Sequence, residues 1–291
     1  MTRKAIHAMG LLACSCLLAA ALPGTAAANT ASAAGTVSSN WAGYAALPSA
    51  GTTLALRSVS GTWQQPAATC TAGREAYSAV WVGLGGFNEG TQALEQIGSD
   101  ADCTRSGRAV YSTWLELVPA ATVNLKLAVH PGDELSASVT VRAHDVLLRI
   151  RDLSTGARFS TIRRAAHIDT SSAEWIVEAP SSCSASACRT LALTNFGSVP
   201  FASATVVEGD RTAAIGEPPL ATVPIELEQR AIQPAPAGSG ARRAASRALI
   251  TAIPSSVSPA DGAFSVSWDE QTLQGEAPPA PALPGFTGAA P

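Results

Sequence analysis

The stretch AVWVGLGGFNEGTQALEQIGSD, residues 79–100, decides the fold of this chain of 291 residues. Within it, residues 81–84 predict a buried strand that ends at a glycine turn, and residues 93–97 predict a second strand. Far along the chain, residues 173–178 (AEWIVE) predict a third strand with carboxylates on one side. We expect a glutamine on the second strand and a glutamate on the third to face each other across a cleft.

Alternating apolar and polar residues, the pattern of half-buried strands, recur along most of the chain. Residues 134–142 and 145–152 show it most clearly, and turn sequences such as 130–133 (HPGD) separate such segments. Because no sustained helical period appears, we expect an all-β, antiparallel sandwich or barrel, with one two-sheet domain over residues 38–272. Further expected strands are residues 59–64, 113–118, 122–129, 158–164, 201–207, 221–227, 249–253 and 263–268.

Three segments fall outside this pattern. Residues 29–37 are small and polar, which predicts a short disordered lead. Residues 229–247 are rich in Pro, Ala, Gly and Arg and predict a surface loop inserted before the last strands. Residues 273–291 are rich in Pro and Ala and predict a disordered tail.

The first 28 residues have the pattern of a secretory signal peptide. Arg3 and Lys4 precede an apolar run over residues 9–22, and alanines at 26–28 supply the small residues of a cleavage site. The run is shorter than the about 20 residues that a membrane-spanning helix needs, which disfavours an anchor. It continues past Cys14, which disfavours a lipoprotein. We therefore expect a secreted, extracellular protein that has no membrane association after signal removal.

The cysteines agree with export, because disulfides persist in oxidising compartments. Cys70, Cys103, Cys183 and Cys188 remain after signal removal and allow three pairings. We favour Cys70 with Cys103 and Cys183 with Cys188, because each pair brackets one compact segment. The alternative is zinc, but neither pair has CxxC spacing and no histidine lies near either, so we expect no metal and no organic cofactor.

The charge balance limits the partners. Charged residues make up only 14% of the chain, and its formal net charge is −3. Signal removal takes away two cations and no acid, which changes the net charge to about −5. A mildly acidic surface argues against nucleic acid or an anionic membrane as a partner. We expect a monomer.

Several common catalytic motifs are absent from the sequence. It contains neither GxSxG nor HExxH, and its glycines at 83–90 fail the GxGxxG spacing of a phosphate loop. His130, His144 and His167 sit in expected turns or at strand ends, where solvated histidines are common. What remains is a set of carboxylates and amides on strands, among aromatic residues.

A period of two sorts these residues onto faces of the sheet. Glu174 and Glu178 share one face of their strand, and Trp175 lies on the other. Gln96 and Glu95 point to opposite sides of theirs. If the faces converge, they form a groove with aromatic walls that suits an extended ligand. The concave face then carries Trp81, Gln96, Trp114, Glu116 and Glu178. The alternative is that these are the outward polar residues of ordinary amphipathic strands.

A series of short motifs follows along the chain in a fixed order. It consists of Ser39-Asn40-Trp41-x-Gly43, Trp81-Val82-Gly83, Leu94-x-Gln96-x-Gly98, Trp114-x-Glu116-x-x-Pro119, AEWIVE at 173–178 and Val199-Pro200-Phe201. Each motif alone is unspecific, but the series resembles the glutamic peptidases, or eqolisins. The resemblance extends from about residue 39 to residue 207, and more loosely to residue 268.

The resemblance implies a concanavalin-like or jelly-roll β-sandwich of two seven-stranded antiparallel sheets. It also implies an endopeptidase that cleaves polypeptide substrates at acidic pH, with Gln96 and Glu178 as its catalytic residues. The family's cleft residues, which bind substrate, fall on Trp41, Trp81, Asp100, Trp114 and Glu116.

Two features depart from the family pattern. Gly85 stands where the family often has an acidic residue, so substrate preference is expected to differ. Only a short lead separates the expected cleavage site from Trp41, so activation by removal of a propeptide is not expected.

The residue types suit peptide hydrolysis. An ionised Glu178 can take a proton from water, and the amide of Gln96 can stabilise the resulting oxyanion. With an ordinary pKa of about 4.3, Glu178 would stay active to neutral pH. A fall in activity there would therefore need a second, protonated carboxyl, and the candidates are Glu116 and Asp100.

Two other functions remain open at this stage. One is a glycoside hydrolase that uses Glu116 and Glu178 as its two carboxylates. The other is a non-catalytic sugar- or peptide-binding module that uses Trp41, Trp81 and Trp114 as a platform.

Overall fold

The structure is a computed structural model that describes residues 35–51, 55–88, 93–183, 188–232 and 246–269. The expected signal peptide (1–28) and tail (273–291) lie outside these residues. The described part of the chain contains no helix, and so none there that is long and apolar enough to cross a membrane.

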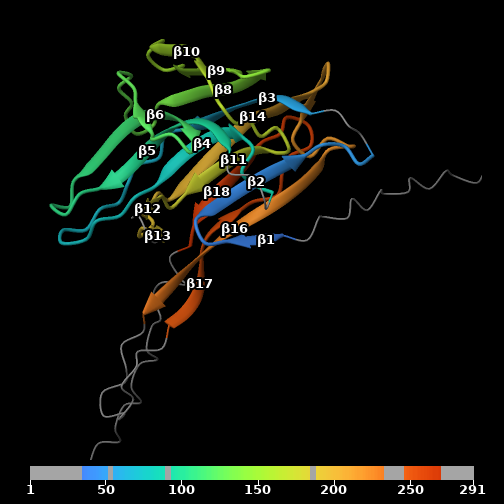
Figure 1. The fold of residues 1–291 in the computed structure, drawn as a ribbon. Coiled ribbons are helices and arrows are strands. Elements are labelled where there is room, and N and C mark those ends of the chain that lie inside the picture. The colour runs from blue at the N-terminus through green and yellow to red at the C-terminus, as the bar shows by residue number, and fades with distance from the viewer. Residues whose placement is uncertain (1–34, 52–54, 89–92, 184–187, 233–245, 270–291) are drawn as a thin grey trace, which may run out of the picture. The chain divides into compact units, whose positions relative to one another are not determined.

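The described residues form the expected all-β sandwich, with two layers of mostly antiparallel strands (Figure 1). The first layer, which carries the candidate site, has the spatial order β16 (Ala221–Ile232), β2 (Trp41–Leu47), β11 (Ala173–Glu178), β4 (Ala79–Leu84), β5 (Leu94–Cys103), β6 (Ala109–Val118) and β7 (Val123–Asn124). The second has the order β10 (Arg158–Arg164), β9 (Asp145–Asp152), β8 (Glu134–Arg142), β3 (Leu56–Gln64), β14 (Ser198–Glu208), β18 (Phe264–Trp268) and β17 (Ser246–Pro254).

The two layers are joined rather than separate, which differs from the two independent sheets implied by the resemblance. β16 pairs with β2 through residues 221–225 and with β17 through residues 227–232. Because the two ends of β16 have different neighbours, one hydrogen-bonded path runs through both layers. Four short strands lie off this path. β1 (Thr36–Ser38) pairs with β16, and β15 (Arg211–Ala214) pairs antiparallel with β14. β12 (Ser181–Cys183) and β13 (Cys188–Thr190) pair with each other.

Large aromatic side chains fill the space between the layers. Trp175 is fully buried and donates from Nε1 to the carbonyl oxygen of Ser60 at 2.8 Å, from the first layer to the second. Trp63 donates in the opposite direction, to Ser99 Oγ at 3.1 Å. Gly61 makes room for this packing, because a Cβ there would lie 2.8 Å from the Trp175 ring. These pairs of buried donor and acceptor fix the two layers in register.

Some expected boundaries are wrong. Thr36 and Val37, assigned to a disordered lead, belong to β1, which pairs in parallel with β16. The inserted loop is shorter than 229–247, because β16 continues to Ile232 and β17 starts at Ser246; residues 233–245 lie outside the described residues. The strand expected at 122–129 is reduced to β7. The errors lie at polar strand ends, where pairing with a distant strand decides the structure.

The two disulfides have the favoured pairing. Cys70–Cys103 ties the loop before β4 to the end of β5, and Cys183–Cys188 closes the β12–β13 hairpin. Both lie near the ends of strands that carry the candidate site.

Candidate active site

A groove of about 410 Å³ lies on the outer face of the first layer, over β4, β5, β6 and the end of β11. The residues that line it are Tyr77, Ala79, Leu94, Gln96, Asp100, Asp102, Trp114, Glu116, Val118, Thr122, Glu178, Pro180 and Ser181. The strand register explains the convergence, because residues directly opposite one another share a face of the sheet. Gln96 lies opposite Glu116, and Glu178 is joined through Ala79 to Asp100.

Glu178 ends β11 and is held by two side-chain donors. Its Oε1 accepts from Asn40 Nδ2 at 3.1 Å, and its Oε2 accepts from Trp81 Nε1 at 2.9 Å. Burial raises the pKa of Glu178 to about 7, although the donors lower it in part and the charge of Glu116 raises it further. The pKa of Glu178 therefore lies above that of an exposed glutamate, because desolvation outweighs the hydrogen bonds.

Trp41 and Trp81 support Glu178 from one side. Their rings pack edge to face, with centroids 5.1 Å apart and planes at 77°. Trp81 is fully buried, so its indole holds the Glu178 carboxylate rather than forming an open wall of the groove. Of the expected cleft residues, these two do not line the groove, whereas Asp100, Trp114 and Glu116 do.

Gln96 is oriented by its neighbour on β6. Its Nε2 donates to Glu116 Oε2 at 2.7 Å, and Glu116 Oε1 accepts from Thr122 Oγ1 at 2.8 Å. A side-chain amide has two N–H donors, so the second one remains for a ligand in the groove. Gln96 is almost fully buried, and its Oε1 has no partner among the described residues.

Asp100 and Asp102 lie on the same face of β5. Asp100 accepts from Trp114 Nε1 and from Ser112 Oγ, both at 2.7 Å. Burial raises the pKa of Asp100 to about 6, against these two hydrogen bonds. Burial also raises the pKa of Asp102 to about 7, with a further contribution from the charge of Asp100. The groove therefore holds acidic groups that stay protonated at weakly acidic pH.

Gly85 explains one departure from the family pattern. Its φ is +85°, in the left-handed region that favours glycine. A Cβ at this position would lie 2.5 Å from the Cβ of Asp169, which comes from the segment before β11. Asp169 Oδ2 accepts from the backbone N–H of Gly86 at 3.1 Å. A carboxylate thus reaches this turn from another part of the chain.

Asn40, Asp102 and Thr122 contribute to the site but were not predicted from the sequence. Asn40 lies next to Trp41 in the first motif, and its position there could have indicated a role. Asp102 could have been found from the period of two, because it follows Asp100 by two residues. Thr122 gave no signal, since it lies in a turn that only the fold brings beside Glu116.

No group of histidine, cysteine, aspartate or glutamate side chains within the described residues could hold a metal ion. The chemistry available in the groove is that of carboxylates, an amide and indoles. A raised carboxyl pKa beside hydrogen-bond donors in a groove is typical of a hydrolytic site.

This groove on a β-sandwich brings together carboxyl and amide side chains, which are residue types that hydrolases use. The peptidase A4 family model matches residues 39–231, more than half of the chain, so the chain belongs to that family. It is accordingly a glutamic endopeptidase. This assignment decides against the glycoside hydrolase and the non-catalytic binding module.

Solved structures agree in fold. The crystal structure of scytalido-glutamic peptidase with a transition state analog inhibitor has 20% identity and a TM-score of 0.61, and the match covers 80% of this chain and 100% of that chain. The structure of SCP-B, a member of the eqolisin family of peptidases, in a complex with the tripeptide Ala-Ile-His has 20% identity, the same coverage and a TM-score of 0.58. Among curated proteins, none matches this chain.

Proposed function

We propose that the protein is a secreted acid endopeptidase in which Glu178 is the general base and Gln96 stabilises the oxyanion. The observation that carries this proposal is that both side chains line one groove, each held by a partner that leaves part of its hydrogen-bonding capacity unused. A groove open along a sheet face suits an extended polypeptide.

Glu178 activates the water. A carboxylate has about four lone-pair sites, and Asn40 and Trp81 occupy two of them. A water between the remaining lone pairs and the scissile carbonyl gives up its proton to Glu178 as it attacks the carbon. The protonated Glu178 then returns the proton to the leaving amine. Such general acid–base catalysis contributes about 10²- to 10⁴-fold.

Gln96 stabilises the negative charge that develops on the carbonyl oxygen. Glu116 holds one N–H of the amide, which directs the other N–H toward the groove. Because glutamine is uncharged at every pH, it adds no repulsion to the ionised Glu178. One such donor contributes about 2.7–4 kcal/mol to the transition state.

Export is proposed on two grounds. The first 28 residues have the pattern of a signal peptide. The structure contains two disulfides, which are typical of oxidising compartments. Polypeptides are the expected substrates.

The experiment is digestion of an unfolded protein by the purified mature enzyme across acidic to neutral pH, with products mapped by mass spectrometry. Gln96→Ala and Glu178→Gln are compared with Gln64→Ala and Glu134→Gln, which change exposed residues of the second layer. We expect internal cuts from the wild type and both controls, and none from the two groove variants. A wild type that is folded and makes no cuts at any pH, or a folded groove variant with the full cut pattern, would contradict the proposal.

A further inference from the structure

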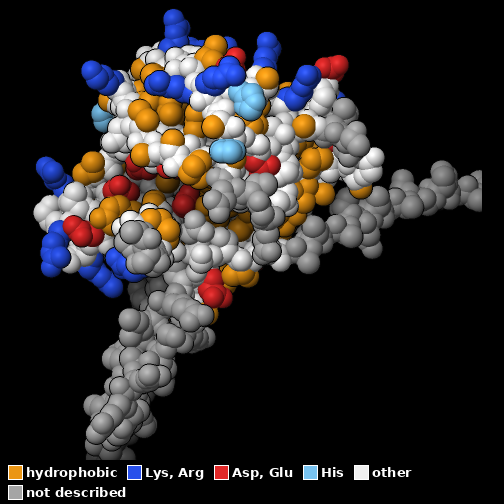
Figure 2. Space-filling view, viewed as in Figure 1, with side chains coloured by type: hydrophobic (Ala, Val, Ile, Leu, Met, Phe, Trp, Pro, Cys, Tyr) orange, Lys and Arg blue, Asp and Glu red, His pale blue; other side chains and the backbone are white. Residues whose placement is uncertain are grey.

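A dense group of arginines lies on the second layer, away from the groove. Within residues 142–164, which we name the arginine hairpin, Arg142, Arg149, Arg151, Arg158, Arg163 and Arg164 are all exposed. The same segment has two acids, Asp145 and Asp152, and Asp152 is fully buried. Arginine side chains project from the side of the molecule formed by β8, β9 and β10, where they are drawn in blue (Figure 2). Although the net charge of the chain is negative, the surface formed by the arginine hairpin is therefore strongly basic.

The strand register places Arg149, Arg151 and Arg158 on one outward face, whereas Arg163 lies opposite the buried Val146. Arg151 lies directly opposite Arg158, and Arg149 lies opposite Ser160. Like charges directly opposite each other destabilise a sheet. A shallow groove of about 280 Å³ runs between these arginines and contains no acidic side chain. The polar side chains that line it are Ser136, Ser138, Arg149, Arg151, Arg158 and Ser160.

Apolar side chains are exposed beside the arginines. Ile162 is 65% exposed, the highest value among the exposed large hydrophobic residues of the described chain. It lies opposite Leu147 on the same outward face, one pair along from Arg149 and Ser160. Leu153, at the turn of the hairpin, is 40% exposed. The surface thus combines guanidinium groups with protruding aliphatic groups.

The need to protect a free sheet edge does not explain the exposed arginines of β9. Charges on an edge strand such as β10 prevent pairing with other chains. However, Arg149 and Arg151 lie on β9, which is paired on both sides by β8 and β10. Their positive charges need another explanation.

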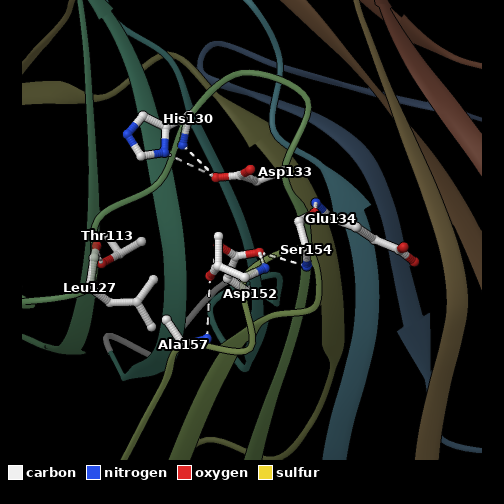
Figure 3. Close-up of polar contacts among 9 residues, drawn as sticks. Thr113, Leu127, His130, Asp133, Glu134, Asp152, Ser154 and Ala157 are labelled. Carbon is white, nitrogen blue, oxygen red and sulfur yellow. Dashed lines mark hydrogen bonds and ion pairs between the residues drawn. The ribbon is translucent and has the colours of Figure 1, made fainter.

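The hairpin is held rigidly at its turn. The carboxylate of Asp152 accepts from the backbone N–H of Ser154 at 2.8 Å and from Thr155 Oγ1 at 2.5 Å, and Ser154 Oγ accepts from the backbone N–H of Glu134 at 2.9 Å (Figure 3). A turn fixed by these bonds limits the backbone entropy that the hairpin loses on binding.

We propose that the arginine hairpin docks the enzyme on an anionic lipid surface, with guanidinium groups on lipid phosphates and Ile162 in the headgroup region. Arginine and phosphodiester both stay charged at acidic pH, whereas the carboxylates of an acidic protein partner become neutral near pH 4. Phe159 is the aromatic side chain that lines this shallow groove, and it is only partly exposed, so the groove offers no series of exposed rings on which successive nucleic-acid bases could stack. The groove lies on the opposite layer, so it stays open when the enzyme is docked.

The test is co-sedimentation of the mature enzyme with vesicles of phosphatidylglycerol and phosphatidylcholine, or of phosphatidylcholine alone, at pH 5 and pH 7. We expect binding only to the anionic vesicles, weakened by salt. Replacing Arg149, Arg151 and Arg158 by glutamine should weaken binding about 100-fold, because each such charge contributes about 1 kcal/mol near a surface. The control replaces Arg74, Arg105 and Arg108, exposed arginines elsewhere, and should bind like the wild type.

Two further comparisons separate lipid from other polyanions. Ile162→Ser should weaken binding to vesicles but not to soluble polyphosphate. Cleavage of a soluble substrate should be unchanged in every variant, which shows that each is folded. The proposal is overturned if anionic vesicles do not bind, if the two triple variants bind equally, or if polyphosphate binds tightly while vesicles bind no better than phosphatidylcholine alone.

Discussion

At the scale of single residues, the behaviour of Glu178 follows from what surrounds it. Burial holds its pKa at about 7, so the carboxylate that acts as base becomes more abundant as pH rises through the acidic range. Asp100, with a pKa of about 6, and Asp102, with a pKa of about 7, ionise over the same range. Their charges would repel the oxyanion that forms in the groove. The two effects oppose each other and predict a maximum of activity at weakly acidic pH.

The residue that causes the fall toward neutral pH can be identified by substitution. Asp100→Asn keeps the acceptor for Trp114 but cannot ionise. We expect kcat/KM of this variant to fall less above pH 6 than that of the wild type, and the rise at lower pH to persist. Glu134→Gln, on an exposed part of β8, is the control. An unchanged pH profile in Asp100→Asn would remove Asp100 from this role.

Glu116 is expected to act through Gln96. Glu116→Ala removes the acceptor that orients the amide, and hydrogen bonds to charged groups contribute about 1.5–3 kcal/mol. We expect kcat to fall about 10- to 100-fold with KM little changed, since the oxyanion forms only in the transition state. Thr122→Val, which removes only the donor to Glu116, should have a smaller effect. A change in KM alone would indicate that Glu116 acts in substrate binding instead.

At the scale of the elements, three acids meet where β5 and β11 pass the turn after β4. Glu95, Asp169 and Glu174 are buried, and both oxygens of Glu95 and Glu174 lack a hydrogen-bond partner among the described residues. Burial raises the pKa of Glu95 to about 8; the backbone of Asp169 acts to lower this pKa, and the charge of Asp169 acts to raise it. Burial raises the pKa of Glu174 well above its usual value, with contributions from the charges of Asp169 and Glu95. The carboxyls of Glu95 and Glu174 are therefore neutral at acidic pH, and burial destabilises their ionised forms.

This cluster predicts how stability depends on pH. A carboxyl whose pKa is raised by folding stabilises the protein fully below its unfolded pKa, and this contribution is lost as pH rises through the folded pKa. The free energy of unfolding should therefore fall between about pH 4.3 and pH 8, by up to about 1.4 kcal/mol per pH unit for each such group. Urea unfolding at pH 4, 6 and 8 measures this slope.

The pH dependence of the free energy of unfolding should be compared between Glu95→Gln and the control Glu134→Gln. Glu95→Gln cannot ionise, so its free energy of unfolding should depend less steeply on pH, whatever its value at pH 4. Glu134→Gln changes an exposed carboxyl and should keep the slope of the wild type. Equal slopes in all three proteins would show that Glu95 does not couple stability to pH.

At the scale of the whole molecule, the two disulfides close loops of different length. The sequence separation is 33 residues for Cys70–Cys103 and 5 for Cys183–Cys188. Loop-closure entropy predicts a loss of roughly 4 kcal/mol when the first is removed by serine substitution and roughly 2 kcal/mol for the second. Urea unfolding of the two double-serine variants checks the order, and a larger loss for Cys183–Cys188 would contradict it.

Much of the fold could be predicted because its strands alternate regularly. β11 has the expected bounds, with Trp175 in the core and Ile176 on the groove face. The family could be predicted because several short motifs occur along the chain in the order that is typical of the glutamic peptidases. What could not be predicted depends on contacts between distant residues, such as the pairing of β1 with β16. The pKa of Glu178 is another case, since Asn40 and Trp81 lie 138 and 97 residues away.

We propose that Glu178 and Gln96 together perform peptide hydrolysis. The most direct measurement is kcat/KM on one peptide substrate at weakly acidic pH for the wild type, Glu178→Gln and Gln96→Ala, each shown to be folded by its unfolding transition. We predict a loss of about 10²- to 10⁴-fold for Glu178→Gln and of about 10²- to 10³-fold for Gln96→Ala. If either folded variant stays within about tenfold of the wild type, well below these ranges, that residue does not have the role proposed for it.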